Sequence, residues 1–89
     1  MDTICLKISK NSYSEFGFHY NWLDHFKIEL FIEDDTVIIR ANKEGLESLA
    51  KHLFLLSQDF VPNHYHLHYD DMNSFEDGSN ALIIEKNNE

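Results

Sequence analysis

Apolar and polar residues alternate along four stretches in the first half of the chain, and this period of two predicts β-strands. The alternation runs over residues 4–8, then less regularly through an aromatic run at 16–22. It returns over residues 26–41, where the acidic pair Asp34-Asp35 interrupts it. Two alternating stretches separated by two turn residues are typical of a β-hairpin. We therefore expect four strands before the first helix.

The period changes to that of a helix between about Lys43 and Ser57. Apolar residues recur there at helical spacing, at Leu46, Leu49, Ala50, Leu53 and Leu56. Asn42 is a favourable N-cap, and Glu44 places a negative charge in the first turn, where it suits the helix dipole. We expect one amphipathic helix, at about residues 43–57, that buries this leucine face.

Two further strand-like stretches follow Pro62. They enclose an acidic loop, Asp70 to Gly78, which ends in the turn sequence Asp77-Gly78-Ser79. We expect them to form a C-terminal hairpin at about residues 64–86. One helix against an antiparallel sheet is the economical way to bury these apolar stripes. The sequence therefore predicts a single α+β domain over residues 1–89. In it, a single amphipathic helix packs on one face of a mostly antiparallel sheet, with the element order β-β-β-β-α-β-β.

A single helix can cover only one face of that sheet, so the opposite face is open to solvent or to a partner. Strand alternation places the following uncharged residues on the open face: Phe31, Ile38, His64, His66, His68 and Ile83. Exposed aliphatic and aromatic side chains of this kind mark protein-interaction surfaces. We expect this face to bind another protein, and a homo-oligomer held together by it is the alternative.

The charge of the chain narrows the choice of partner. The 89 residues include 16 Asp and Glu against 7 Lys and Arg, a formal net charge of -9. Such a chain has little means to neutralise phosphates, so we expect no nucleic-acid partner. The surplus of carboxylates favours a basic protein partner, although an acidic surface can also serve solubility alone.

We expect a cytoplasmic protein with no membrane partner. Residues 1–10 lack the pattern of a signal peptide, and no stretch approaches the roughly 18 apolar residues that span a bilayer. Cys5 is the sole cysteine, so an intrachain disulfide is excluded, which agrees with a reducing compartment.

Three histidines alternate at His64, His66 and His68, and zinc sites also use this pattern. On a regular strand the outer two lie roughly 13 Å apart, too far to share one ion. A metal site would need a further ligand. The alternative function is a small metal-binding protein or metalloenzyme that uses these three histidines together with Asp70. We expect no bound metal and no other cofactor, because 89 residues leave little room for an enclosed cleft.

The acidic loop has four carboxylates, but it lacks the ligand spacing of a calcium loop. Catalysis by paired carboxylates needs a cleft that separates their pKa values, and so small a domain offers little cleft. We therefore do not expect an enzyme. We predict instead a partner-binding surface made of the histidines, the loop and two aromatic anchors, namely His64, His66, His68, Tyr69, Asp70, Asp71, Phe75, Glu76 and Asp77.

Several short segments are similar to a known bacterial family. They are Asn42 to Leu53, the tripeptide His66-Leu67-His68, the loop 73–79 and the stretch 82–86. Together they resemble the family called immunity protein 32. The resemblance implies small cytoplasmic proteins, encoded beside polymorphic toxins, that protect the producing cell by binding the toxin's active domain. Such toxins are often nucleases, which are commonly basic, so the implied partner agrees with the acidic composition.

Overall fold

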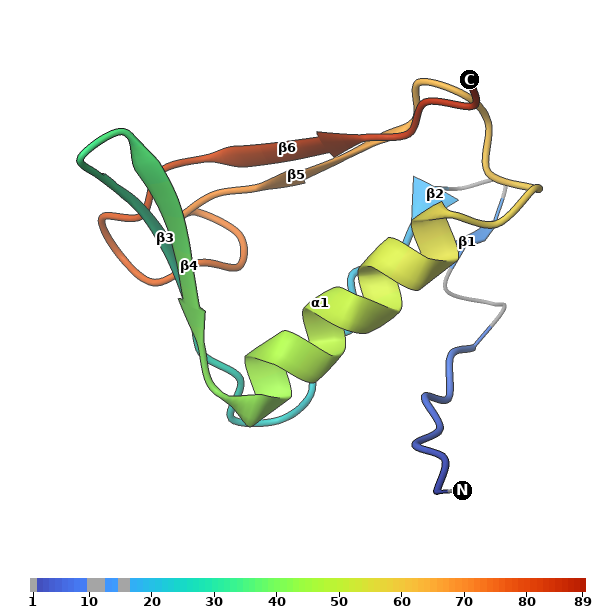
Figure 1. Ribbon diagram of the computed structural model, residues 1–89, viewed down its shortest axis with the longest axis horizontal. Helices are drawn as coiled ribbons and strands as arrows, with labels where there is room; N and C mark the ends of the chain where they lie inside the picture. The colour runs from blue at the N-terminus through green and yellow to red at the C-terminus, as the bar shows by residue number, and fades with distance from the viewer. Residues whose placement is uncertain (1, 10–12, 15–16) are drawn as a thin grey trace.

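The computed structural model describes residues 2–9, 13–14 and 17–89. Its elements are β1 (Tyr13–Ser14), β2 (Gly17–Phe18), β3 (Ile28–Glu33), β4 (Thr36–Ala41), α1 (Lys43–Leu56), β5 (His66–Tyr69) and β6 (Leu82–Glu85). Figure 1 shows α1 crossing the molecule, with the β3–β4 hairpin rising from its N-terminal end at the left and the β5–β6 hairpin running across the top of the view. The α+β class and the order β-β-β-β-α-β-β are as the sequence predicts.

The described strands form three two-stranded antiparallel sheets, β1–β2, β3–β4 and β5–β6, where the sequence predicts one larger sheet. The segment after the acidic loop joins two of them. The Glu76 amide donates to the Ile28 carbonyl at 2.9 Å, and the Asn80 amide donates to the Leu30 carbonyl at 2.9 Å. The Ser79 hydroxyl accepts the Leu30 amide at 3.2 Å. An irregular segment, and not a regular strand, therefore occupies the edge of β3.

The turn that joins β3 to β4 lies at Asp34-Asp35, and this confirms the predicted hairpin. Asp34 and Asp35 both have positive φ angles, 50° and 62°. A two-residue turn with φ positive at both positions matches the twist of the flanking strands. It sets the register Ile28↔Ala41 through Glu33↔Thr36.

Helix α1 begins where the sequence predicts and ends one residue before the expected Ser57. The Asn42 side chain accepts the Gly45 amide at 2.8 Å, which satisfies one of the free donors at the helix start. The same oxygen accepts the Lys27 amide at 3.0 Å, and the Asn42 amide group donates to the His25 carbonyl at 2.9 Å. One side chain thus caps the helix and attaches the segment that leads into β3.

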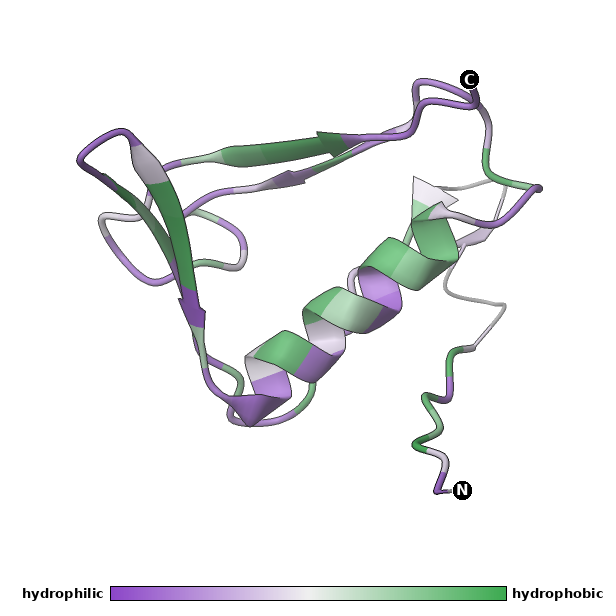
Figure 2. Ribbon diagram, in the orientation of Figure 1, coloured by the Kyte–Doolittle hydropathy of each residue, from purple (hydrophilic) through white to green (hydrophobic). Residues whose placement is uncertain are grey.

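The face that α1 buries differs from the predicted leucine face. The buried residues are Gly45, Ser48, Leu49, His52, Leu55 and Leu56. Leu46 is 54% exposed and Leu53 is 40% exposed, and Ala50 between them is exposed too. In Figure 2 apolar and polar colours alternate along the side of the helix that faces the viewer. The predicted buried face was wrong by a shift of about one residue along the helix. The shift arises because Ser48 and His52 find hydrogen-bond partners in the interior.

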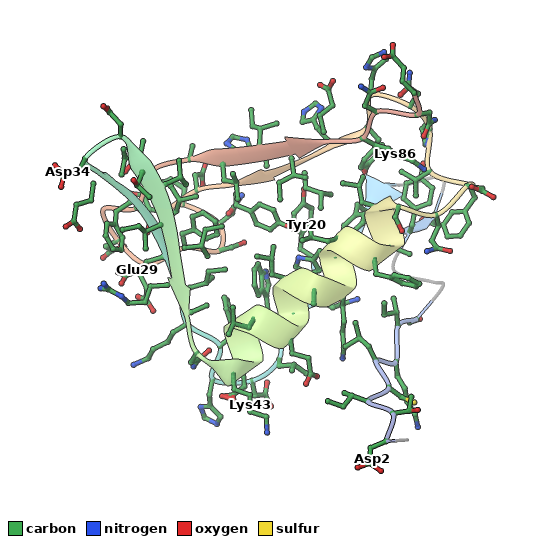
Figure 3. All side chains as sticks on the ribbon, viewed as in Figure 1. Asp2, Tyr20, Glu29, Asp34, Lys43 and Lys86 are labelled. Atoms are coloured by element: carbon green, nitrogen blue, oxygen red, sulfur yellow. The ribbon has the colours of Figure 1, made fainter. Side chains whose placement is uncertain are left out.

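The core lies between α1 and the two large hairpins. Its buried members are Ile28, Leu30, Leu49, Leu56, Val61, Leu67, Tyr69 and Phe75. Tyr20 lies in the space between α1 and β5–β6 in Figure 3, and its ring contacts that of Tyr69 at 5.5 Å between centroids. The aromatic run before β3 therefore packs as a cover on this core.

The N-terminal strands lie elsewhere than predicted. Residues 4–8 are described but form no strand, and Ile4 is fully exposed. Of the predicted strand 16–22, Phe16 lies outside the described residues and only 17–18 pair, with Tyr13–Ser14. An alternating sequence becomes a strand only when a sheet edge accepts it, and residues 76–80 already occupy one such edge, that of β3. Within the described ranges, none of the helical segments combines the length and apolar character needed to cross a bilayer.

Candidate partner-binding surface

The histidines on β5 point away from the core. Along this strand His66 and His68 are exposed, whereas Leu67 and Tyr69 are fully buried. Antiparallel pairing places His66 opposite Glu85 and His68 opposite Ile83. Because strand side chains alternate, the outer face of the β5–β6 hairpin presents imidazoles, a carboxylate and one exposed isoleucine.

His64 precedes β5 and has a φ of 69°, so it does not continue the strand. Its Nδ1 lies 3.3 Å from the Glu85 carboxylate, and both side chains are exposed. His68 Nε2 lies 3.4 Å from the Asp70 carboxylate. Each of these two histidines therefore pairs with its own carboxylate, and exposed pairs of this kind add little stability.

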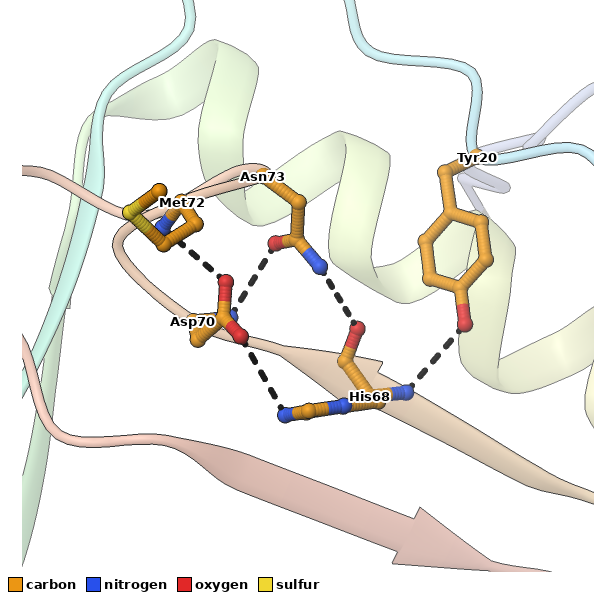
Figure 4. Close-up of polar contacts among 5 residues, drawn as sticks. All are labelled: Tyr20, His68, Asp70, Met72 and Asn73. Atoms are coloured by element: carbon orange, nitrogen blue, oxygen red, sulfur yellow. Dashed lines mark hydrogen bonds and ion pairs between the residues drawn. The ribbon is translucent and has the colours of Figure 1, made fainter.

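The acidic loop is folded by its own side chains, as Figure 4 shows. The Asp70 carboxylate accepts the Met72 amide at 2.9 Å, while the Asn73 side chain accepts the Asp70 amide at 3.0 Å. The Asn73 amide group also donates to the His68 carbonyl at 3.2 Å. Asp70 and Asn73 thus act as turn-forming residues that fix the loop to the end of β5.

The remaining carboxylates of the loop are exposed to solvent. Asp71 accepts the Gly78 amide at 3.3 Å, and Gly78 itself has a φ of 84°, a conformation that favours glycine. Glu76 and Asp77 are exposed. The loop therefore presents several negative charges on a small, internally braced segment.

Two of the predicted partner-binding residues lie in the core. Tyr69 has no exposed surface and Phe75 is 5% exposed. Their rings stack on each other with centroids 5.5 Å apart and planes 5° apart. This burial corrects the expectation that they anchor a partner, because a partner cannot reach either ring in this conformation. They instead support the exposed loop from below.

A polar contact that the sequence does not predict holds Tyr69 in place. His52 on α1 is buried, its Nδ1 lies 2.9 Å from the Tyr69 hydroxyl, and its Nε2 lies 3.0 Å from the Asn21 carbonyl. A carbonyl can only accept, so Nε2 carries the proton and the tyrosine hydroxyl donates to Nδ1. Burial lowers the pKa of His52 below its ordinary 6.5, and the bond to Asn21 offsets part of this. Burial likewise raises the pKa of Tyr69, with a smaller contribution from Tyr20.

The histidine triplet does not form a metal centre in this conformation. Among the residues that the structure describes, no three His, Cys, Asp or Glu side chains are arranged to hold one ion. His64 does not continue the strand, and His64 and His68 contact two different carboxylates, those of Glu85 and Asp70.

The predicted open face is divided because the sheets are separate. On the β3–β4 hairpin, Phe31 and Ile38 are half-buried, and the Arg40 guanidinium lies over the Phe31 ring at 4.9 Å. Arg40 also pairs with Glu29 at 3.2 Å. Ile83 on the other hairpin is 61% exposed. The exposed part of the predicted surface is therefore the β5–β6 face together with the acidic loop.

A second exposed apolar surface escaped the sequence analysis. It follows the outer side of α1 through Leu46, Ala50, Leu53 and Phe54, and all four are exposed. Ser48 and His52 share the helical spacing of Leu49, Leu55 and Leu56, and this was the signal that another face could be the buried one.

The comparisons with known proteins agree with the segments noted in the sequence. No curated protein and no solved structure matches the chain. The model of one family, described as immunity protein 32, matches residues 36–87. This range contains β4, α1, β5, the acidic loop and β6. Because the match spans more than half of the chain, the protein belongs to the immunity protein 32 family.

Proposed function

We propose that this protein is an immunity protein that binds and neutralises the toxin domain of a bacterial polymorphic toxin system in the cytoplasm. The family match over residues 36–87 carries the proposal, because an immunity protein implies a toxin as its partner. The protein acts by forming a stoichiometric complex, with no catalytic step and no cofactor.

The charge of the chain supports a basic toxin domain. A net charge of -9 attracts a positively charged partner and speeds its association. It also disfavours nucleic acid, whose phosphates carry the same sign. A nuclease must attract phosphates, so it is the toxin class whose surface best complements this one.

The proposed contact surface is the outer face of β5–β6 with the acidic loop. It retains seven of the predicted residues, namely His64, His66, His68, Asp70, Asp71, Glu76 and Asp77, all at least partly exposed. Tyr69 and Phe75 belong to its buried support. Carboxylates around an exposed isoleucine give the arrangement of an apolar centre with a polar rim that protein interfaces use.

Co-expression with the toxin domain encoded by the neighbouring gene tests the function. We expect growth to be restored and the two proteins to co-purify as a complex with nanomolar affinity that buries on the order of 1,600 Å². Rescue without a physical complex would mean that the protein protects by chemistry, and the binding proposal would be abandoned.

Charge reversal tests the contact surface. The double variant Glu76→Lys with Asp77→Lys changes two exposed side chains that hold none of the loop contacts described above. We expect slower association with the toxin domain and a weaker dependence on salt. The matched control is Glu33→Lys with Asp59→Lys, which changes the net charge equally at exposed positions outside the loop. Equal association rates for the two double variants would show that net charge alone acts and that the loop is not the contact.

A further inference from the structure

An open pocket of about 410 Å³ lies at the edge of β5 that faces away from β6, beside the acidic loop. Its lining combines two aromatic rings with three polar side chains, namely Tyr20, Trp22, His68, Asn73 and Ser74. Tyr20 and Trp22 come from the segment before β3, whereas the polar residues come from β5 and the loop. The pocket is therefore formed by tertiary contact between two distant parts of the chain.

The aromatic walls are held in place by the core. The Tyr20 hydroxyl accepts the His68 amide at 3.2 Å, and its ring meets Tyr69 edge to face. Trp22 stacks on Phe26, with centroids 4.4 Å apart and planes 15° apart, and meets His52 at 4.7 Å. Rings fixed in this way lose little conformational entropy when a ligand binds.

A carboxylate lies next to the pocket. The Asp70 side chain is 3.4 Å from His68 Nε2 and is partly exposed, while Asn73 in the pocket wall accepts the Asp70 amide, as Figure 4 shows. By contrast, the pocket of about 250 Å³ beside α1 has two lysines, Lys7 and Lys51, in its lining.

We propose that the aromatic pocket receives the guanidinium group of an arginine side chain from the toxin domain. The rings of Tyr20 and Trp22 attract a flat cation by cation–π interaction, and Asp70 supplies the opposite charge. This inference rests on the proposed function and identifies the chemistry of one contact within it. The base of a nucleotide would also fit aromatic walls, but Asp70 and the net charge of -9 would repel the phosphate of that nucleotide.

The chain offers a direct reporter, because Trp22 is its sole tryptophan. We would titrate the isolated protein at low salt with L-arginine amide, with L-citrulline amide, whose side chain has equal length and no charge, and with AMP. We expect the Trp22 emission to respond to arginine amide at concentrations at least tenfold below those needed for citrulline amide. Equal responses to the two amides, or tighter binding of AMP, would overturn the proposal.

The variant Asp70→Asn removes the charge while it keeps an oxygen that can accept the Met72 amide. We expect it to weaken arginine amide binding about tenfold, with an unchanged melting temperature. Asp35→Asn is the matched control, because it makes the same charge change in the distant β3–β4 turn, at a positive φ that asparagine accepts. An equal loss in both variants would contradict a local role for Asp70.

Binding to the toxin domain distinguishes a failure of the pocket inference from a failure of the proposed function. If Asp70→Asn dissociates from the toxin domain about tenfold faster than Asp35→Asn does, the pocket is part of the interface. If the wild-type protein binds the toxin domain and both variants dissociate at its rate, the pocket inference fails while the immunity function stands. Failure of the wild-type protein to bind would instead overturn the proposed function.

Discussion

The two long faces of α1 differ in a way that the residue types alone would not suggest. The inward face has Gly45, Ser48 and His52 at its centre, and the outward face has Leu46 and Leu53. Both polar side chains on the inward face are satisfied. The Ser48 hydroxyl donates to the Glu44 carbonyl at 2.7 Å and accepts the Leu23 amide at 2.9 Å.

The difference shows that close approach and hydrogen bonding decided how this helix is rotated. Glycine at position 45 lets the helix approach the backbone of the segment before β3. In the described part of the chain no buried side-chain polar atom lacks a partner, so the polar centre of the inward face costs little. The outward leucines remain available for a partner, since no described element covers them.

Substitution of Gly45 should have the largest effect on this arrangement. A Cβ atom there would lie 2.5 Å from the Lys27 carbonyl oxygen and 3.2 Å from the Ala41 Cβ. We expect Gly45→Val to lower the free energy of unfolding by about 3 kcal/mol, because the backbone has to move. Urea unfolding measures this, with Ala50→Val on the outward face as the control. Valine has a higher helix propensity than glycine and a lower one than alanine, so a loss for Gly45→Val no larger than that for Ala50→Val would contradict the role of close approach.

Removal of the buried imidazole should have the next largest effect. We expect His52→Ala to cost about 2 to 3 kcal/mol of unfolding free energy, because it leaves a cavity and deprives the buried Tyr69 hydroxyl of its partner. Chemical denaturation monitored by circular dichroism gives the value. The neighbouring variant Leu53→Ala should cost clearly less, and the reverse order would contradict the assignment of the two faces.

The pH dependence of stability should carry a signature of His52. The unfolded chain takes up a proton near the ordinary histidine pKa of 6.5, whereas burial gives the folded state a lower pKa. The contribution of His52 is therefore fully present above pH 6.5 and is lost as the pH falls through the lowered folded pKa, by at most about 1.4 kcal/mol per pH unit. Unfolding between pH 7.5 and 5 in wild type and His52→Gln measures it. Parallel curves would rule out a role for this histidine.

The outward face should be the least sensitive to substitution. We expect Leu46→Gln and Leu53→Gln each to change the free energy of unfolding by no more than about 0.5 kcal/mol, because both side chains are already largely exposed. Thermal unfolding provides the comparison with Leu49→Gln on the inward face. A loss above about 1 kcal/mol at either outward position would mean that this face packs against part of the chain in solution.

Local sequence by itself determined the elements whose causes lie within a few residues. The Asp34-Asp35 turn specifies the β3–β4 hairpin, since a two-residue loop leaves one register. Asn42 specifies the start of α1 through its own side chain. The alternation at 66–69 places His66 and His68 on one side and Leu67 and Tyr69 on the other, because a strand's period of two does not depend on its neighbours. It did not prevent the wrong expectation that Tyr69 anchors a partner.

Tertiary structure decided what depends on partners distant in the chain. Whether Tyr69 and Phe75 anchor a ligand or fill the core depends on how α1 and the segment before β3 close over them. Residues 4–8 have a strand pattern but form no strand, because alternation alone does not supply a partner strand, and one candidate edge, that of β3, holds residues 76–80. The buried face of α1 likewise depends on Asn21, Leu23 and Lys27, which a helical periodicity cannot take into account. A hydrophobic pattern reports which residues can be buried, whereas distant hydrogen bonds and close contacts select among them.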